Sequence, residues 1–211
     1  MSIFKHTGAA LLAAFLAGAP ALPSYSQTPA QQHLRMDSGF NGLLRHDGTV
    51  FNTSQLAGKP TLLFFGFTSC GTICPTALNA LTLAAEELER RHGKDAVPNL
   101  LLVTTAPEHE GTDHIAGYLK HFHPGFIGLA AQKDAFSSDP QVVAKVQQIE
   151  RLLEKFRVVR DSHHSPFAYL MGGDMRFLGR PLNTQDSPES LASAIAALLD
   201  LKTDVAARPQ P

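Results

Sequence analysis

The feature of this sequence that most constrains its fold is an uninterrupted apolar run, TLLFFGF, at residues 61–67. Because the run does not alternate with polar residues, it predicts a strand buried on both faces, as in the centre of a helix-covered parallel sheet. CGTICP follows at residues 70–75, and residues 75–91 repeat apolar side chains at helical spacing. We therefore expect a central strand, a short loop that carries two cysteines, and a helix.

The remaining pattern alternates short apolar segments with amphipathic ones. Strands are expected at residues 100–104, 126–129 and 167–171, helices at 112–121, 140–156 and 187–199, and hairpins at 40–51 and 167–178. This order predicts an α/β fold, a thioredoxin-like three-layer sandwich with a central mixed sheet and an N-terminal hairpin. In open sheets of this kind, sites lie beyond the carboxyl ends of the strands, where both cysteines come.

The first 26 residues have the pattern of an export signal. Lys5 precedes an apolar run at residues 8–19, which is short for a membrane span, since a span needs ~20 apolar residues. We predict a signal peptide or short anchor at residues 1–26 and a periplasmic location. Contact with the inner membrane is expected only if this segment stays uncleaved. A flexible lead-in at 27–37, one domain at 38–201 and a loose tail at 202–211 complete the predicted organisation.

The net charge and the two cysteines reduce the number of possible functions. The formal net charge of -1 gives no basic excess for nucleic-acid binding. Two cysteines in an exported chain indicate either a structural disulfide or a working dithiol. The second is favoured, because so short a loop would restrict the unfolded chain only modestly.

Cys70 and Cys74 have the spacing of a disulfide or of a two-sulfur chelate. In a helix, their Cα atoms would be about 6 Å apart and their sulfurs would face the same side. The positive end of the helix dipole is expected to favour thiolate at Cys74. Thiolates suit copper(I), and a third ligand would come from His163 or His164, which precede the expected strand at 167–171.

The other histidines carry weaker signals. His121 and His123 alternate as two ligands might, but we expect them to be exposed in a loop. His109 and His114 lie among acidic residues and are expected to form a polar loop rather than a second metal site.

Residues 47–199 resemble the Sco (SenC) family of copper-binding thioredoxin-fold proteins. The resemblance rests on Gly-Lys-Pro at 58–60, FFGFTSC at 64–70 with Cys-Pro at 74–75, and HSPFAYL at 164–170. It implies copper binding by Cys70, Cys74 and His164, with His163 in place of the family's usual aspartate. It also implies delivery of copper, or of reducing equivalents, to the CuA centre of cytochrome c oxidase, with a thiol reductant as a further partner.

Two departures accompany the resemblance. The family's Asp-Pro-Glu-Arg-Asp motif reads Ala-Pro-Glu-His-Glu at residues 106–110, which puts partner docking or electron transfer in doubt. Pro166 falls near the place where redox-active thioredoxins carry a cis-proline, and a cis bond there would favour disulfide exchange. An ordinary trans-proline that opens a strand is the alternative.

Three functions are therefore compared. The first is a copper metallochaperone for cytochrome c oxidase or a related exported cuproprotein. The second is an exported thiol–disulfide oxidoreductase that keeps client cysteines reduced, and both can hold, because a dithiol must be reduced before it binds metal. The third, a peroxiredoxin-like peroxidase, is disfavoured because no activating arginine lies close to the cysteines in the sequence.

Overall fold

The computed structural model describes residues 34–159 and 166–201. Within them, six strands form one mixed sheet in the order β1-β4-β3-β2-β5-β6. They are β1 (Leu44–Arg45), β2 (Thr61–Gly66), β3 (Asn99–Thr104), β4 (Phe126–Ala130), β5 (Phe167–Met171) and β6 (Leu182–Asn183). β2, β3 and β4 are parallel, whereas β1, β5 and β6 are antiparallel to the strands they join. The predicted central strand is β2, and all six of its residues are buried.

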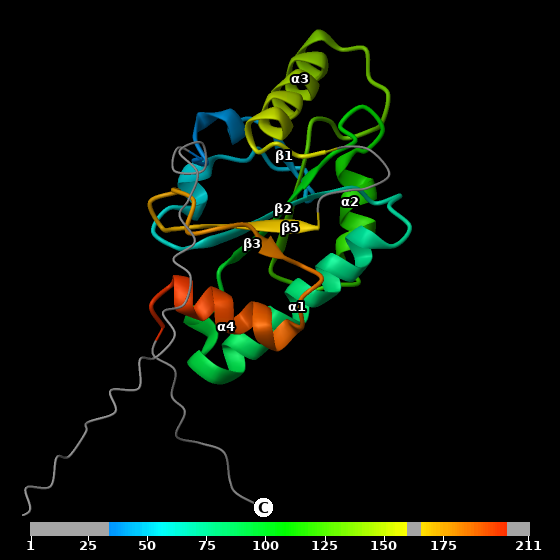
Figure 1. Ribbon diagram of the computed structural model, residues 1–211. Coiled ribbons are helices and arrows are strands. Elements are labelled where there is room, and N and C mark those ends of the chain that lie inside the picture. The colour runs from blue at the N-terminus through cyan, green and yellow to red at the C-terminus, as the bar shows by residue number, and fades with distance from the viewer. Residues whose placement is uncertain (1–33, 160–165, 202–211) are drawn as a thin grey trace, which may run out of the picture.

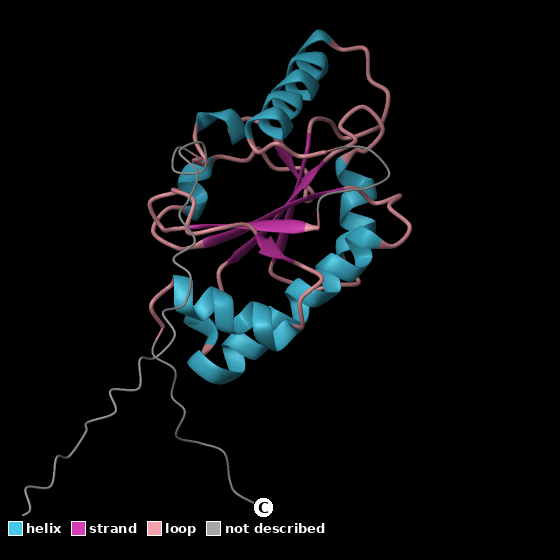
Figure 2. Cartoon of the chain, viewed as in Figure 1, coloured by secondary structure: helices cyan, strands magenta, loops and turns pink. Residues whose placement is uncertain are grey.

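Helices cover both faces of this sheet. They are α1 (Ile73–His92), α2 (Thr112–Leu119), α3 (Pro140–Lys155) and α4 (Pro188–Leu198), with short 3-10 turns η1 (Ser38–Phe40), η2 (Thr53–Leu56) and η3 (Lys94–Ala96). Figures 1 and 2 show α1, α2 and α4 on one side of the sheet and α3 on the other. The predicted three-layer arrangement is therefore confirmed.

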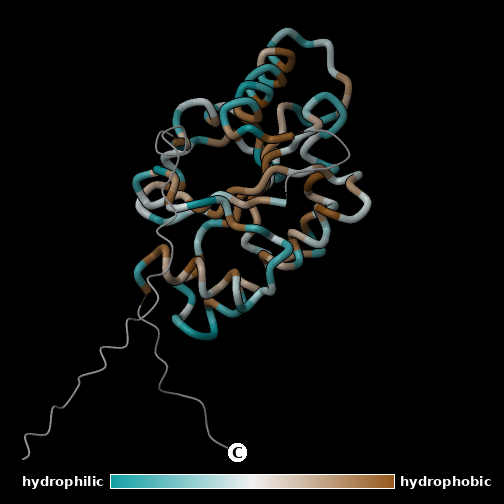
Figure 3. The backbone as a smooth tube through the Cα atoms, viewed as in Figure 1, coloured by the Kyte–Doolittle hydropathy of each residue, from teal (hydrophilic) through white to brown (hydrophobic). Residues whose placement is uncertain are grey.

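The alternation of side chains along the strands creates two cores. Leu62 and Phe64 of β2 pack with α1, α2 and α4, whereas Leu63 and Phe65 pack with α3. The strands accordingly form a hydrophobic band through the middle of the molecule in Figure 3. A strand apolar on both faces is thus explained by helices on both faces.

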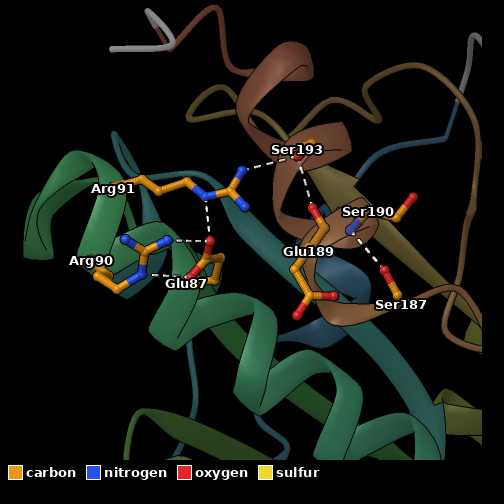
Figure 4. Close-up of polar contacts among 7 residues, drawn as sticks. All are labelled: Glu87, Arg90, Arg91, Ser187, Glu189, Ser190 and Ser193. Atoms are coloured by element: carbon orange, nitrogen blue, oxygen red, sulfur yellow. Dashed lines mark hydrogen bonds and ion pairs between the residues drawn. The ribbon is translucent and has the colours of Figure 1, made fainter. Parts of the chain in front are cut away.

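One hydrogen bond among those drawn in Figure 4 joins α1 to α4. Arg91 of α1 is paired with Glu87 and donates a hydrogen bond to the hydroxyl of Ser193 at 3.1 Å. The α4 helix begins as predicted, because the Ser187 hydroxyl accepts the N–H of Ser190 at 3.2 Å. The hydrogen bond between Arg91 and Ser193 therefore ties the last turn of α1 to α4.

The hairpin that follows β5 is less regular than the sequence predicts. Met171 pairs with Phe177 in an isolated bridge, and regular pairing resumes only at β6. Gly179, with a φ of 69°, and Pro181, which has no N–H to donate, separate the bridge from β6. The hairpin therefore exists, but its second arm is interrupted.

The N-terminal region also differs from the sequence-based prediction in one respect. The predicted hairpin forms as a bridge between Leu44 and Val50, around a turn in which Gly48 has a φ of 82°. Met36, however, is only 2% exposed and donates its N–H to the carbonyl of Met175. Residues 34–37 thus belong to the folded domain rather than to a flexible lead-in.

The predicted signal segment and the predicted tail lie outside the described residues. Among residues 34–159 and 166–201, no helix combines the length and the apolar character that crossing a membrane requires.

Candidate metal and redox site

The two cysteines lie beyond the carboxyl end of the central strand β2. Cys70 is in the loop between β2 and α1, and Cys74 is in the first turn of α1. Both thiols are free. Cys70 is half-buried, whereas Cys74 is only 1% exposed. The site therefore offers one accessible sulfur and one sulfur that is shielded from solvent.

The sulfur of Cys70 caps the helix that carries Cys74. The first N–H groups of a helix have no partner within it, and Thr72, the residue before α1, makes no side-chain cap. Instead, the N–H of Cys74 donates to the Sγ of Cys70 over 3.2 Å. The positive end of the α1 dipole therefore acts on the sulfur of Cys70.

Cys74 behaves differently from the sequence-based prediction. Burial, the hydrogen bond with the Cys70 thiol and the negative charges of Cys70 and Glu110 raise the pKa of Cys74 to about 12. Desolvation disfavours the charged thiolate and outweighs the favourable helix dipole. The prediction that the helix start favours thiolate at Cys74 is thus wrong for the metal-free dithiol.

Gly66 makes room for the buried sulfur. A Cβ atom at this position would lie 3.2 Å from the Sγ of Cys74 and 2.8 Å from Cε1 of Phe64. Both distances are shorter than ordinary van der Waals contacts, so even an alanine side chain would have to displace a neighbour. The sequence places Gly66 in the FFGFTSC motif but does not predict that it leaves space for the sulfur of Cys74.

Glu110 ties the cysteine loop to the adjacent strand. Its side chain is buried, and its Oε1 accepts hydrogen bonds from both the N–H and the hydroxyl of Thr68. Its Oε2 accepts from the hydroxyl of Thr104, at the end of β3, over 2.6 Å. This carboxyl therefore supports the loop that begins at Thr68 and leads to Cys70.

Gln132 holds the segment around Glu110 in place. Its side-chain amide is buried and donates to the carbonyls of Pro107 and Glu108 at 2.9 and 3.0 Å. Its side-chain oxygen accepts the N–H of Ser137. Glutamine at such a place carries no sequence signal, because its partners come from two separate loops.

The weaker histidine candidates do not gather into a site. His109 is exposed and its ring meets that of Phe136 edge-to-face, with centroids 5.1 Å apart. His114 lies on α2 rather than in a loop, and its Nδ1 accepts the N–H of Gly111. His121 is exposed, as expected, whereas His123 is half-buried, and its Nδ1 accepts the N–H of Gly125 at 3.0 Å. Within residues 34–159 and 166–201, no group of three or more His, Cys, Asp or Glu residues is arranged for a metal ion.

The predicted third ligand lies outside the described residues, as does its neighbour His163. The described chain resumes at Pro166, whose carbonyl accepts the N–H of Thr184 at 2.7 Å. No peptide bond between described residues is cis. The bond before Pro166 involves a residue outside the described part, so its isomer stays a prediction.

A helix-covered mixed sheet with a free Cys-x3-Cys pair after its central strand defines a thioredoxin-like protein with a dithiol site. Solved structures agree with this class. Arabidopsis thaliana ScoI with copper bound superposes with a TM-score of 0.62 at 27% identity, over 77% of this chain and 99% of that one. Bradyrhizobium japonicum ScoI with copper bound superposes with a TM-score of 0.58 at 26% identity, over 75% of this chain and 96% of that one.

The chain belongs to the SCO1/SenC family, whose model matches residues 28–200. The family resemblance inferred from the cysteine and histidine motifs is therefore confirmed. Among curated relatives, the SCO2-like protein of Rickettsia felis is 34% identical over 148 residues. That match covers 64% of each chain, so the present chain spans just under two thirds of that relative's length.

Proposed function

We propose that this protein is a copper metallochaperone that binds copper through Cys70, Cys74 and His164. Its cargo would go to the CuA centre of cytochrome c oxidase or to a related exported cuproprotein. The observation that carries the proposal is the pair of free thiols beyond the carboxyl end of β2, one in the loop before α1 and the other in its first turn.

The donor set fits copper. Thiolates are soft ligands that copper(I) accepts readily, and imidazole suits copper as well. Gly66 leaves space beside the sulfur of Cys74, so the buried thiol is not crowded by a side chain from the strand. Copper-bound structures of two relatives at 26% and 27% identity support the same choice of metal.

Sheet topology supports the choice of histidine. β5 is antiparallel to β2, and Ala168 pairs with Phe64 near the end of β2. The start of β5 therefore lies at the same edge of the sheet as the cysteine loop. His164 comes three residues before β5 begins, at Phe167.

The unequal exposure of the two thiols suits transfer. Cys74, enclosed between α1 and the sheet, would retain the metal, while half-exposed Cys70 would be the sulfur that a client's ligands can approach. Because metal-bound cysteines are thiolates, both thiols would release their protons when copper binds.

The difference in exposure between the two thiols also favours a second function, thiol–disulfide exchange. The thiolate of Cys70 would attack a client disulfide, form a mixed disulfide and release one client thiolate. The thiolate of Cys74 would then attack the sulfur of Cys70 and release the second client thiolate. The client would gain two electrons and two protons, and Cys70 and Cys74 would form a disulfide that a thiol reductant must reduce.

The proposal places the protein outside the cytoplasm. The apolar run at residues 8–19 supports export, with the domain in the periplasm either free or tethered by an uncleaved first segment. Fractionation of cells, with the N-terminal sequence of the recovered protein, would distinguish the two.

The decisive experiment is a copper(I) competition between a chelator and the reduced protein. Wild type is expected to bind one copper tightly, and His164→Ala and Cys74→Ser are expected to lose most of that affinity. His121→Ala replaces an exposed histidine and serves as the matched control. Copper binding that is weak, or indifferent to His164, would leave thiol–disulfide exchange as the leading function.

A further inference from the structure

Phe136 is a large apolar side chain that the fold leaves in solvent. It is 75% exposed, and its φ of 62° lies in the left-handed region, which is costly for a bulky residue. Its N–H donates to the carbonyl of Glu108 at 2.9 Å, and the N–H of Ser137 donates to the side chain of Gln132 at 3.1 Å. These hydrogen bonds hold an exposed aromatic residue in a strained backbone conformation, and strain of this kind clusters at functional positions.

The first half of α3 leaves further apolar surface uncovered. The buried residues of α3 all lie in its second half, at Ile149, Leu152 and Leu153. Figure 1 shows the helix extending past the sheet. In its first half, Val143 is 42% exposed and Val146 is only partly buried. Apolar side chains that the protein's own core does not cover are available to another molecule.

A hollow of about 270 Å³ joins these side chains. Phe136, Val143 and Val146 line it together with Glu108 and Glu150, and none of its described lining residues is a lysine or an arginine. Its volume is below the ~300–1,000 Å³ of small-molecule pockets, so it fits an apolar side chain of another protein better than a cofactor. Aromatic residues in such hollows supply much of the binding energy of protein interfaces.

The hollow lies at the edge of the sheet that carries the dithiol. β2, β3 and β4 are parallel, so their carboxyl ends share one edge. The cysteine loop follows β2, Glu108 follows β3, and Phe136 follows β4. A protein that binds at the hollow would therefore approach the same edge of the sheet as Cys70.

We propose that this hollow docks a segment of another protein in which a large apolar side chain is flanked by lysine or arginine. The apolar side chain would pack on Phe136 and Val143, and the basic groups would face Glu108 and Glu150. Charge complementarity favours this occupant over a second copy of the chain, because two such surfaces would bring like charges together. The inference goes beyond the proposed function and does not depend on metal binding by the dithiol.

The test uses random short peptides displayed on phage. Selection on the reduced wild-type protein is expected to enrich peptides that carry a large apolar residue beside lysine or arginine. The most enriched peptide is then labelled with a fluorophore, and its affinity is measured by anisotropy. Its binding should weaken as salt is added, because exposed charges are screened. A selection that enriches no peptide, or enriches acidic ones, would overturn the proposal.

Variants of the hollow identify the residues that bind the peptide. Phe136→Ala keeps a side chain at a φ of 62° but removes the ring, and should weaken peptide binding by about tenfold or more. Val143→Ala should weaken it as well, whereas Val50→Ala removes an apolar side chain that is 61% exposed outside the hollow and should change nothing. A new selection on Glu108→Lys should favour acidic peptides. Equal affinity of Phe136→Ala and wild type, or an unchanged preference in Glu108→Lys, would overturn the proposal.

Two further measurements separate the hollow from the fold and from the dithiol. All of these variants should keep the urea midpoint and the copper(I) affinity of wild type, because the replaced side chains are exposed. Should Phe136→Ala fail to fold, Val143→Ala and Glu108→Lys decide the outcome. Self-association of wild type that Glu108→Lys abolishes would assign the hollow to a second copy and overturn the proposal. Failure of wild type to bind copper would overturn the proposed function and leave the docking surface standing.

Discussion

Replacement of Glu110 tests whether the dithiol loop depends on a buried carboxyl group. Glu110→Ala removes the acceptor of three hydrogen bonds, two from Thr68 and one from Thr104. The side chain is only 3% exposed, so its removal leaves these donors without an acceptor from the protein. The loop that leads to Cys70 would lose its attachment to the end of β3.

The size of the effect follows from the kinds of donor involved. A buried donor left without an acceptor costs about 1–3 kcal/mol. The N–H of Thr68 cannot rotate toward a new partner, whereas the hydroxyls of Thr68 and Thr104 can. We therefore expect Glu110→Ala to lower the free energy of unfolding by about 2–4 kcal/mol. Glu110→Gln keeps the shape and one acceptor oxygen, and should cost about 1–2 kcal/mol.

Urea unfolding of the copper-free protein measures both losses. The chain has no tryptophan, so far-ultraviolet circular dichroism is the suitable signal. Glu108→Ala is the matched control, because Glu108 is exposed, lies in the same loop and uses its backbone carbonyl rather than its side chain to bind Gln132. Equal unfolding midpoints for Glu110→Ala and Glu108→Ala would refute the reasoning.

Three further results are expected. Gly66→Ala should lower the free energy of unfolding by about 1–3 kcal/mol and weaken copper binding, because the new methyl group meets the sulfur of Cys74. Unchanged urea unfolding and unchanged chelator competition would contradict this. Phe136→Gly should raise stability to urea by up to about 1 kcal/mol, since Phe136 is 75% exposed at a φ of 62°, and a loss would show that its contacts outweigh the strain. Burial lowers the pKa of His46 from 6.5, and its Nδ1 accepts the N–H of Gly128. The contribution of His46 to the free energy of unfolding is therefore full above pH 6.5 and is lost as the pH falls below that value. In urea titrations down to about pH 5, the free energy of unfolding of His46→Gln should fall less steeply with pH than that of wild type.

Some of this architecture could be predicted because the signals are local. The apolar run at 61–67 indicates a doubly covered strand whatever its neighbours are, and β2 occupies residues Thr61–Gly66. Ser187 before a proline predicts a helix start, and its hydroxyl caps α4. The place of the cysteines follows directly from the end of β2.

The rest depended on partners that are distant in sequence. Glu110 and Thr68 are separated by 42 positions, so no local pattern predicts a hydrogen bond between them. The burial of Cys74 results from packing between α1 and the sheet, and it reverses the effect predicted from the helix dipole alone. The hydrogen bond of Glu110 thus had no local signal, and for Cys74 a local expectation was overruled by tertiary contacts.

The departures from the family motif at residues 106–110 fall on a particular part of the site. Position 106, where the family usually has aspartate, is alanine, and its N–H is bound by the hydroxyl of Thr104 at 3.0 Å. Position 109, usually arginine, is an exposed histidine whose ring meets that of Phe136 edge-to-face. Position 110 keeps its acidic character as Glu110 and supports the cysteine loop. An acidic residue is therefore retained at the position that supports the loop leading to Cys70, whereas the changed residue at position 109 is exposed and makes no part of that support.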